Sequence, residues 1–369
     1  MSEWVNISPS NDIFLIESDQ IGKNVITCIE SLRDSQTGWI STDYGGSWSS
    51  FSVDRPQAVG VSRNGKVFVL GSWLGSYYKI FLSFDYGATW IESYSSENAD
   101  AEDGFLSGLP TGITVDETGE IIAIFNEHIA YITITTDGGE TWTRKPTNLT
   151  DPEPWGQYGS LDLSFDNSSL LLAHYYAGVF ISDNLGDSWS EVTPPAPTYD
   201  GWFWSKAEFI GTSNEHMIAS NDRVGTWAIL PSYERTWVRV DNTPYGDTSF
   251  CSASLDGTTL AWVGYSGDLA LIEYSLDGGN TTEIYNTSNG FYGYKCVAAN
   301  NGVIYLIYDA SPSYDYFLAR HKGGGLIKAI LGVPYSTGVF SVLGIEKLNI
   351  KKIAGQPDNS IYLESEEEE

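Results

Sequence analysis

One eight-residue pattern recurs along this chain and constrains its fold more than any other feature. The pattern is Ser/Thr-x-Asp-x-Gly-x-Ser/Thr-Trp, and it occupies residues 41–48, 83–90 and 135–142. Residues 182–189 carry Asn in place of Asp, and residues 275–282 end in Thr in place of Trp. An Asp or Asn oxygen accepts hydrogen bonds from backbone N–H groups two or more residues further on, and Gly supplies a positive φ. The pattern therefore predicts a tight hairpin, after which the Trp buries a large flat surface on the next strand.

The spacing of these hairpins predicts a structural repeat. The interval between the fourth and fifth copies is about twice as long as the others, so a degenerate copy is expected between them. Residues 232–237 read Ser-Tyr-Glu-Arg-Thr-Trp and fit that place, and a seventh turn at 321–325 retains only its glycines. A repeat of about 40–50 residues with room for four strands is typical of β-propeller blades.

Each unit contains four short strand-like segments, as the third unit illustrates. Apolar residues predict an innermost strand at 112–115, a second at 120–125 and a third at 129–135, and the outer strand starts at Trp142. With 38 glycines, two methionines and hardly any helical periodicity, the chain is predicted to be all-β, a β-propeller of four-stranded blades.

The two ends of the chain determine the predicted number of blades. Seven units account for roughly residues 9–331 and leave strand-like runs within 339–363, while residues 4–8 resemble an outer strand. Pairing of 4–8 with strands from 339–363 would close the ring and remove its open edges. This count gives eight blades, with seven as the alternative. We expect one domain over residues 1–363, followed by a solvated, disordered acidic tail at 364–369.

The five hairpins resemble the Asp-box (BNR) repeats of sialidase-like β-propellers, and the resemblance spans nearly the whole chain. It implies that the box hairpins share one face, and that ligand or catalytic sites use the opposite face, formed by the connections between blades. Because the box is a structural turn, it predicts the fold rather than an activity.

The residues that sialidases use for catalysis do not match this chain. The resemblance calls for an arginine cluster, with one Arg in an Arg-Ile-Pro-like motif before the first box. The single Arg-Pro, Arg55-Pro56, follows the first box, and no motif joins Arg144, Arg223 and Arg239. Xyloglucanase-like hydrolases would use two carboxylates instead, and the sequence selects no pair. Photosystem-assembly propellers bear a basic patch that this acidic chain lacks.

The strongest candidate ligand site is the stretch 199–204, which places four aromatic rings, three of them in the run 202–204, near an acid after a Pro-rich run at 194–197. Aromatic faces next to a carboxylate suit sugar recognition; the alternative is packing between blades. The longest predicted loop contains a second candidate, the acidic run 97–103, whose alternative is plain solvation. The predicted ligand-binding residues are Trp155, Tyr199, Asp200, Trp202, Trp204 and Arg223.

Charge and composition narrow the partners. The net charge of −29 disfavours nucleic acid and anionic membranes. Cys28, Cys251 and Cys296 are predicted to be buried thiols, and no cofactor or metal site is expected. The N-terminus shows no signal peptide and no segment suits membrane insertion, which predicts cytoplasmic synthesis and leaves the final location and oligomeric state open. We therefore expect a non-catalytic binding or structural propeller, a virion or phage tail component that contacts glycans or other structural proteins. The alternative is a glycoside hydrolase.

Overall fold

The computed structural model describes most of the chain between residues 4 and 322 and two short segments beyond it. The described residues are 4–10, 13–29, 36–75, 77–98, 109–126, 131–147, 149, 159–195, 203–231, 236–241, 247–266, 269–286, 293–309, 316–322, 350–351 and 362–363.

These residues form seven antiparallel four-stranded sheets, which we number as blades 1 to 7 in chain order. Blade 1 consists of β2 (Leu15–Ser18), β3 (Val25–Cys28), β4 (Gln36–Ser41) and β5 (Ser49–Val53). Blade 2 consists of β6 (Pro56–Val61), β7 (Phe68–Trp73), β8 (Tyr78–Ser83) and β9 (Ile91–Ser95). Blade 3 consists of β10 (Pro110–Val115), β11 (Ile122–Asn126), β12 (Tyr131–Thr135) and β13 (Thr143–Pro146). Blades 4 and 5 consist of β14 (Gly159–Leu163), β15 (Leu170–His174), β16 (Gly178–Ser182) and β17 (Ser190–Glu191), then β18 (Trp204–Phe209), β19 (Met217–Asn221), β20 (Gly225–Ile229) and β21 (Val238–Arg239). Blades 6 and 7 consist of β22 (Asp247–Ala253), β23 (Leu260–Ser266), β24 (Leu269–Ser275) and β25 (Glu283–Asn286), then β26 (Gly293–Ala299), β27 (Val303–Asp309), β28 (Tyr316–Lys322) and β1 (Trp4–Asn6).

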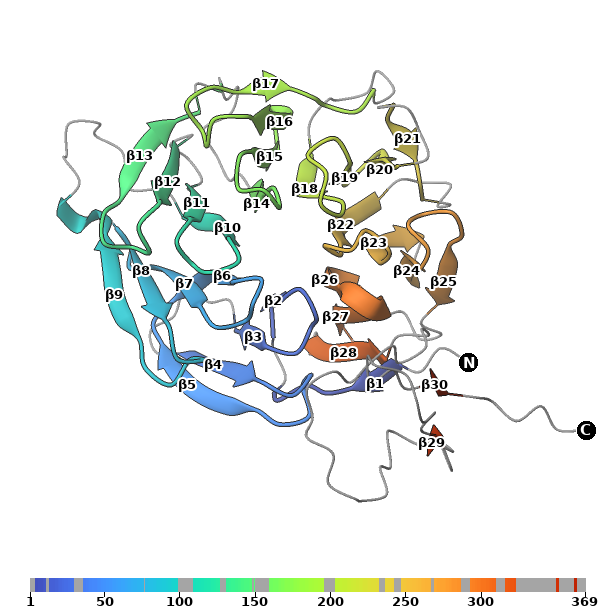
Figure 1. The fold of residues 1–369 in the computed structure, drawn as a ribbon, viewed down its shortest axis with the longest axis horizontal. Helices are drawn as coiled ribbons and strands as arrows, with labels where there is room; N and C mark the ends of the chain where they lie inside the picture. The colour runs from blue at the N-terminus through green and yellow to red at the C-terminus, as the bar shows by residue number, and fades with distance from the viewer. Residues whose placement is uncertain are drawn as a thin grey trace, which may run out of the picture. The chain divides into compact units, whose positions relative to one another are not determined.

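The innermost strands of the seven blades contact one another in a closed ring. Each of β2, β6, β10, β14, β18 and β22 contacts the next, and β26 returns to β2. Figure 1 shows the blades arranged around a central axis. Only two short 3₁₀ helices, η1 (Ser96–Asn98) and η3 (Asn300–Gly302), interrupt the strands in the described part. The all-β propeller prediction is confirmed.

The N-terminal strand completes blade 7. The N-terminal strand β1 pairs with β28, with Trp4 opposite His321 and Asn6 opposite Ala319. The described residues form seven blades, the alternative to the predicted eight; the predicted pairing of residues 4–8 with 339–363 remains a prediction, because most of 339–363 lies outside the described residues. Blade 7 ends its third strand at Lys322, and β1 supplies its outer strand. An eighth blade is not needed to give the N-terminal strand a partner.

The five clear box turns share one hydrogen-bond pattern. In the first, the Asp43 carboxylate accepts a bond of 2.8 Å from Ser47 N–H, and Ser41 Oγ accepts one of 2.8 Å from Gly45 N–H. The same two bonds recur in the other four turns at 2.7–2.9 Å, with Asn184 replacing the Asp in one of them. The local prediction of a side-chain-stabilised hairpin is thus confirmed.

The tryptophan after each box precedes an outer strand by one residue, but it is half-buried rather than largely buried. This applies to Trp48, Trp90, Trp142, Trp189 and Trp237. The outer strand forms the rim of the blade, where only one face of the ring is covered. Three of these indoles also donate hydrogen bonds to the preceding blade around the ring: Trp48 to Ile7 O at 2.9 Å, Trp142 to Ser93 Oγ at 3.0 Å and Trp237 to Val192 O at 2.8 Å.

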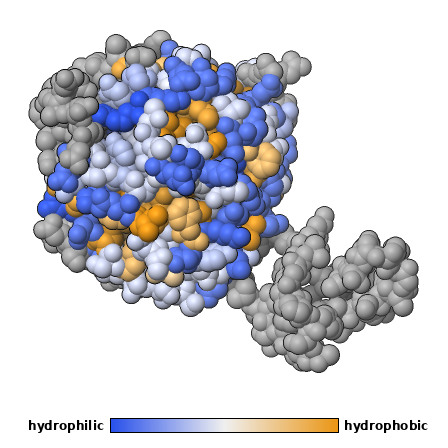
Figure 2. Space-filling model, turned by 60° about the vertical axis from the view of Figure 1, so that its left-hand side comes forward, coloured by the Kyte–Doolittle hydropathy of each residue, from blue (hydrophilic) through white to orange (hydrophobic). Residues whose placement is uncertain are grey.

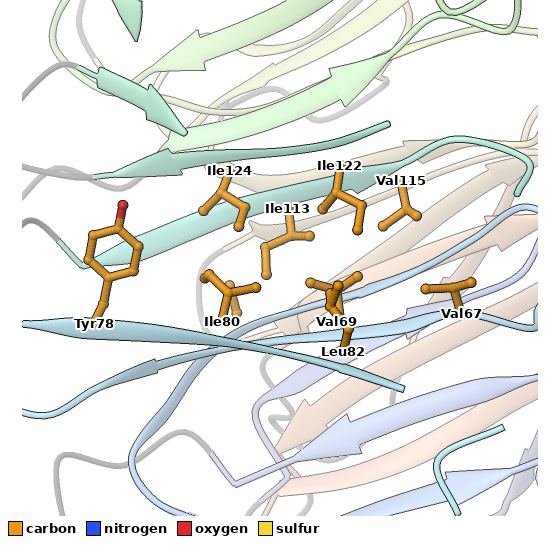
Figure 3. Close-up of a cluster of buried hydrophobic side chains, with 10 residues drawn as sticks. Val67, Val69, Tyr78, Ile80, Leu82, Ile113, Val115, Ile122 and Ile124 are labelled. Carbon is orange, nitrogen blue, oxygen red and sulfur yellow. The ribbon is translucent and has the colours of Figure 1, made fainter. Parts of the chain in front are cut away.

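Neighbouring blades pack through continuous apolar layers. Between blades 2 and 3, Val69, Ile80 and Leu82 point toward Ile113 and Ile122, and all five are buried (Figure 3). Burying a branched aliphatic side chain contributes about 1.5–3 kcal/mol, so these layers hold the ring together.

The three cysteines are free and buried, and burial raises the pKa of each thiol far above its usual range. Their predicted burial is confirmed. No described helix is long and apolar enough to cross a bilayer, and no group of three or more His, Cys, Asp or Glu within the described ranges is arranged to hold a metal ion.

A second compact unit spans Gly325–Glu369. In it, β29 (Ile350–Lys351) pairs with β30 (Tyr362–Leu363) in an antiparallel two-stranded sheet. The extension of the propeller domain to residue 363 and the disorder of 364–369 remain predictions, because the tail lies outside the described residues.

Candidate functional site

The strand order assigns the loops to two faces. The box turns and the turns between first and second strands lie at one edge of each blade, which we call the box face. The connections between second and third strands, and between blades, lie at the opposite edge, the loop face. On the loop face of blades 4 and 5, three segments meet: the β15–β16 hairpin, the β19–β20 hairpin and the residue before β18.

Three aromatic rings from these segments form one cluster. Tyr175 packs edge-on against both Tyr176 and Phe203, with centroids 5.0 Å apart in each pair. The Tyr176 and Phe203 centroids are 6.2 Å apart. All three rings are half-buried, so each retains surface for a ligand.

An exposed arginine extends this cluster. The guanidinium carbon of Arg223 lies 4.2 Å from the centre of the Phe203 ring, within the range of a cation–π contact. Its position is fixed by the hairpin, because Asn221 Oδ1 accepts hydrogen bonds from Arg223 N–H at 2.9 Å and Val224 N–H at 3.1 Å. We call Tyr175, Tyr176, Phe203 and Arg223 the aromatic platform.

The backbone of Phe203 is held in an unusual conformation. Its φ is +80°, in the left-handed region that residues with a bulky side chain rarely adopt. Both neighbouring hairpins hold it there. Phe203 N–H donates to Tyr175 O, and Phe203 O accepts from Asp222 N–H at 3.0 Å. The ring is therefore positioned by two hairpins at once.

The Tyr175 hydroxyl is kept protonated by its surroundings. Burial, followed by the negative charge of Asp222, raises its pKa to about 12, and Asp222 is also its hydrogen-bond partner. At neutral pH the platform therefore presents a phenol beside a carboxylate and a guanidinium, a mixture suited to hydrogen bonding a polar ligand whose apolar face stacks on the rings.

The structure describes two of the six predicted ligand-binding residues. Arg223 contacts Phe203 as part of the platform. Trp204 is completely buried among Leu171, Ala207 and Phe209, so it is a packing residue and faces no ligand. Trp155, Tyr199, Asp200 and Trp202, and most of the acidic run 97–103, lie outside the described residues.

Three platform residues were missed by the sequence analysis. The available signals were the Tyr-Tyr pair in the short β15–β16 hairpin and the Phe in the 199–204 stretch. Phe203 lies at a φ of +80° in the turn before β18 and its ring is half-buried, whereas Trp204, the first residue of the strand, is completely buried.

A second cluster of charged groups lines the central channel. Lys206 and Glu208 of β18 form an ion pair of 2.8 Å. The Glu208 carboxylate also accepts bonds from Ser252 Oγ at 2.9 Å and Ala253 N–H at 2.8 Å in blade 6. Asp162 of blade 4 accepts a bond of 2.8 Å from Phe209 N–H. These side chains thus join the inner strands of successive blades.

Burial shifts the acids of this channel toward their neutral forms. Burial raises the pKa of Glu17 to about 7 and that of Asp162 to about 6, and the nearby Glu208 carboxylate adds to both shifts. The channel cavity measures about 130 Å³. That is room for about four water molecules at ~30 Å³ each, and less than the roughly 300 Å³ of a small ligand site. We interpret the cluster as a hydrated network that links blades.

Fold and strand order together define a seven-bladed β-propeller, and solved structures agree. YCF48 from Cyanidioschyzon merolae has a TM-score of 0.60 at 14% identity, over 87% of this chain and 99% of that chain. YCF48 bound to a D1 peptide has a TM-score of 0.58 at 13% identity, over 86% and 96%. The GH74 xyloglucanase from Xanthomonas campestris has a TM-score of 0.58 at 10% identity, over 86% of this chain and 55% of that one. No protein-family model and no curated sequence matches this chain. At these identities the similarity concerns the fold alone.

Proposed function

We propose that this chain is a non-catalytic binding propeller whose partner contacts the aromatic platform on the loop face. The observation that carries the proposal is the backbone of Phe203. A bulky residue held at positive φ costs on the order of 1–3 kcal/mol, and such strain concentrates at ligand sites. Arg55, directly before the inner strand of blade 2, also has a positive φ of 43°, but among the described residues at this position only Phe203 carries an aromatic ring.

The partner that best fits this chemistry is a glycan. The rings offer flat apolar surface to the C–H face of a sugar, while Tyr175 and Arg223 can bond to its hydroxyls. In this proposal Trp155, Tyr199, Asp200 and Trp202 extend the platform, because they belong to the same predicted loop face. A protein partner is the second candidate, since exposed Tyr and Arg are enriched at the energetic centres of protein interfaces.

The setting we propose is a virion or phage tail, where such a propeller contacts surface glycans or other structural proteins. The shared geometry of the box turns supports a distant relation to Asp-box propellers of the sialidase-like type. The acidic body and the lack of a sialidase arginine motif support a role in binding.

A glycoside hydrolase is the competing function. In its favour, Glu17 and Asp162 have raised pKa values of about 7 and 6, as a general acid requires. Against it, the channel that holds them has a cavity of only about 130 Å³.

A glycan array and a hydrolysis assay on sialosides and β-glucans test the proposal together. We expect the purified protein to bind a glycan without cleaving it. Binding should be lost in Arg223→Gln and Phe203→Gly, and kept in Phe84→Ala, which removes an exposed ring from a box turn instead. Release of sugar by the wild type, abolished in Glu17→Gln, would establish the hydrolase. If the wild type neither binds a glycan nor releases sugar, the glycan assignment is overturned in favour of the protein partner.

A further inference from the structure

The box face has a polar cavity between blades 1 and 2 that the platform does not involve. Its volume is about 490 Å³, within the range of small-ligand sites. The cavity is lined by the β2–β3 turn, the β6–β7 turn and the first two box turns, next to β2, β3, β6 and β7 in Figure 1. The lining residues are Asp19, Gln20, Ile21, Lys23, Asn24, Thr42, Arg63, Asn64 and Tyr86.

The walls of this cavity are firmly held. The Asp19 carboxylate accepts bonds from Lys23 N–H at 2.8 Å and from Asn24 Nδ2 at 2.6 Å, which fixes the β2–β3 turn. The backbone of Gln20 is tied on both sides, to Arg63 O at 3.3 Å and to Asn300 N–H at 2.8 Å. A site with a fixed backbone loses little conformational entropy when a ligand binds.

Arg63 forms a rigid part of the wall because its guanidinium is already bonded elsewhere. Its two Nη atoms donate to the carbonyls of Leu163 and Ser164, each at 2.7 Å, and to Phe165 O at 3.0 Å, in blade 4. Arg63 therefore shapes the cavity and is not a flexible clamp for an anion.

Several side chains around the cavity keep hydrogen-bonding capacity for a ligand. Within the described part of the chain, the Gln20 amide, the Lys23 ammonium and the Thr42 hydroxyl have no partner. Beside them, Tyr86 is 45% exposed and Ile21 is 38% exposed, so a flat apolar surface adjoins the polar groups. Figure 2 shows how small hydrophobic groups alternate with hydrophilic residues on one side of the surface.

We propose that this cavity binds a neutral monosaccharide unit, with the Tyr86 ring stacking on the sugar and Gln20, Lys23 and Thr42 bonding its hydroxyls. Uncharged hydroxyls suit a lining that carries both a carboxylate and cations. An acidic sugar would meet the field of a chain with a net charge of −29. The site stands apart from the platform, and neither proposal depends on the other.

The chain offers a closely matched pair of variants for the test. Tyr86 and Tyr44 occupy the same position of two box turns, both at positive φ, 59° and 62°, and both exposed. Tyr44 does not line the cavity. The corresponding residues in two other boxes are Gly138 and Gly278. Tyr86→Gly and Tyr44→Gly should therefore both fold, because glycine adopts this φ without strain.

Saturation-transfer NMR and calorimetric titration with methyl glucoside, methyl galactoside and methyl mannoside measure binding, with glucuronate as the acidic comparison. We expect millimolar binding of at least one neutral glycoside, weakened at least tenfold in Tyr86→Gly and several-fold in Gln20→Ala, and unchanged in Tyr44→Gly. No binding to the wild type overturns the proposal, as does full affinity in Tyr86→Gly. A preference for glucuronate overturns the neutral assignment. Loss of binding in Arg223→Gln alone assigns the sugar to the platform instead and overturns this site.

Discussion

The box turns and the aromatic platform both hold aromatic residues at positive φ, for different reasons. Tyr44 and Tyr86 adopt φ values of 62° and 59° because the box hydrogen bonds impose that turn, and other boxes carry glycine there. Phe203 adopts a φ of 80° directly before the inner strand of blade 5, at the position where Arg55 precedes that of blade 2 with a φ of 43°. Phe203 is held there by two hairpins that belong to different blades.

The comparison distinguishes backbone strain that the box turn imposes from backbone strain that positions a ring of the proposed binding site. Where strain recurs with the blade repeat, replacement by glycine should be harmless. Where strain positions a ring at the surface, replacement should leave the fold intact and remove binding.

The largest expected effect on stability distinguishes Trp204 from its neighbour Phe203. Trp204→Ala should lower the free energy of unfolding by about 3–5 kcal/mol, because the whole ring is buried. Phe203→Ala should lower it by about 1 kcal/mol, because its ring is half exposed. Urea denaturation of both variants measures this. Equal losses would mean that Phe203 is a core residue and that the comparison fails.

The next effect concerns the box turns. Asp277 accepts hydrogen bonds from Thr281 N–H at 2.8 Å and from the Ser275 hydroxyl at 2.8 Å. Asp277→Ala should destabilise the protein by about 1–2 kcal/mol. Asp277→Asn is the control and should cost less than half of that, because Asn184 serves in another box. Thermal denaturation of both variants measures the loss. An Asp277→Ala variant as stable as the wild type would mean that the box hydrogen bonds do not stabilise the turn.

The stability contributions of Asp137 in a box turn and of Glu17 in the channel should change with pH in opposite directions. Hydrogen bonds lower the pKa of Asp137 to about 2, so its stabilising effect is present above pH 4 and is lost as the pH falls toward 2. Burial raises the pKa of Glu17 from 4.5 to about 7, so its favourable neutral form is present below pH 4.5 and is lost as the pH rises through 7.

Glu17→Gln tests the channel half of this statement. Relative to the wild type, the variant should gain about 2 kcal/mol in unfolding free energy at pH 8, with a smaller difference at pH 5. Denaturation at both pH values measures the change. A pH-independent difference would show that Glu17 is already ionised in the folded protein.

The smallest expected effect on stability is that of Phe203→Gly, which tests the binding role of Phe203 directly. Phe203→Gly relieves the backbone strain and loses ring contacts, so the unfolding free energy should change by less than about 1 kcal/mol. Glycan binding should nevertheless disappear. Stability and binding measured on the same preparation test both halves, and retained binding would remove Phe203 from the site.

The box turns were predictable because they are local. Each depends on hydrogen bonds between residues two to four positions apart, such as Ser41 to Asp43 and Asp43 to Ser47. The blade repeat then gave the fold class. The closure was not predictable in the same way, because pairing of β1 with β28 joins residues more than 300 positions apart, and the apolar pattern of 339–363 offered a competing partner.

The candidate site was predictable only in outline. The sequence pointed to the stretch 199–204 and to Arg223. The orientation of individual rings was not predictable, because Phe203 and Trp204 are both aromatic and the turn before β18 decides which one is buried. The Tyr175–Phe203 contact joins two blades and leaves no local trace in the sequence.

The pairing of β1 with β28 also has a consequence during synthesis on the ribosome. Residues 4–6 are synthesised more than 300 positions before their partner strand Tyr316–Lys322. At about 5–20 residues per second, the N-terminal strand waits roughly 15–60 s for its partner. Throughout that time blade 1 lacks the Ile7 carbonyl held beside Trp48, and the ring stays open at one seam. Nascent chains should therefore be exposed to strand exchange with one another until the last blade appears, and closure should be the final folding event.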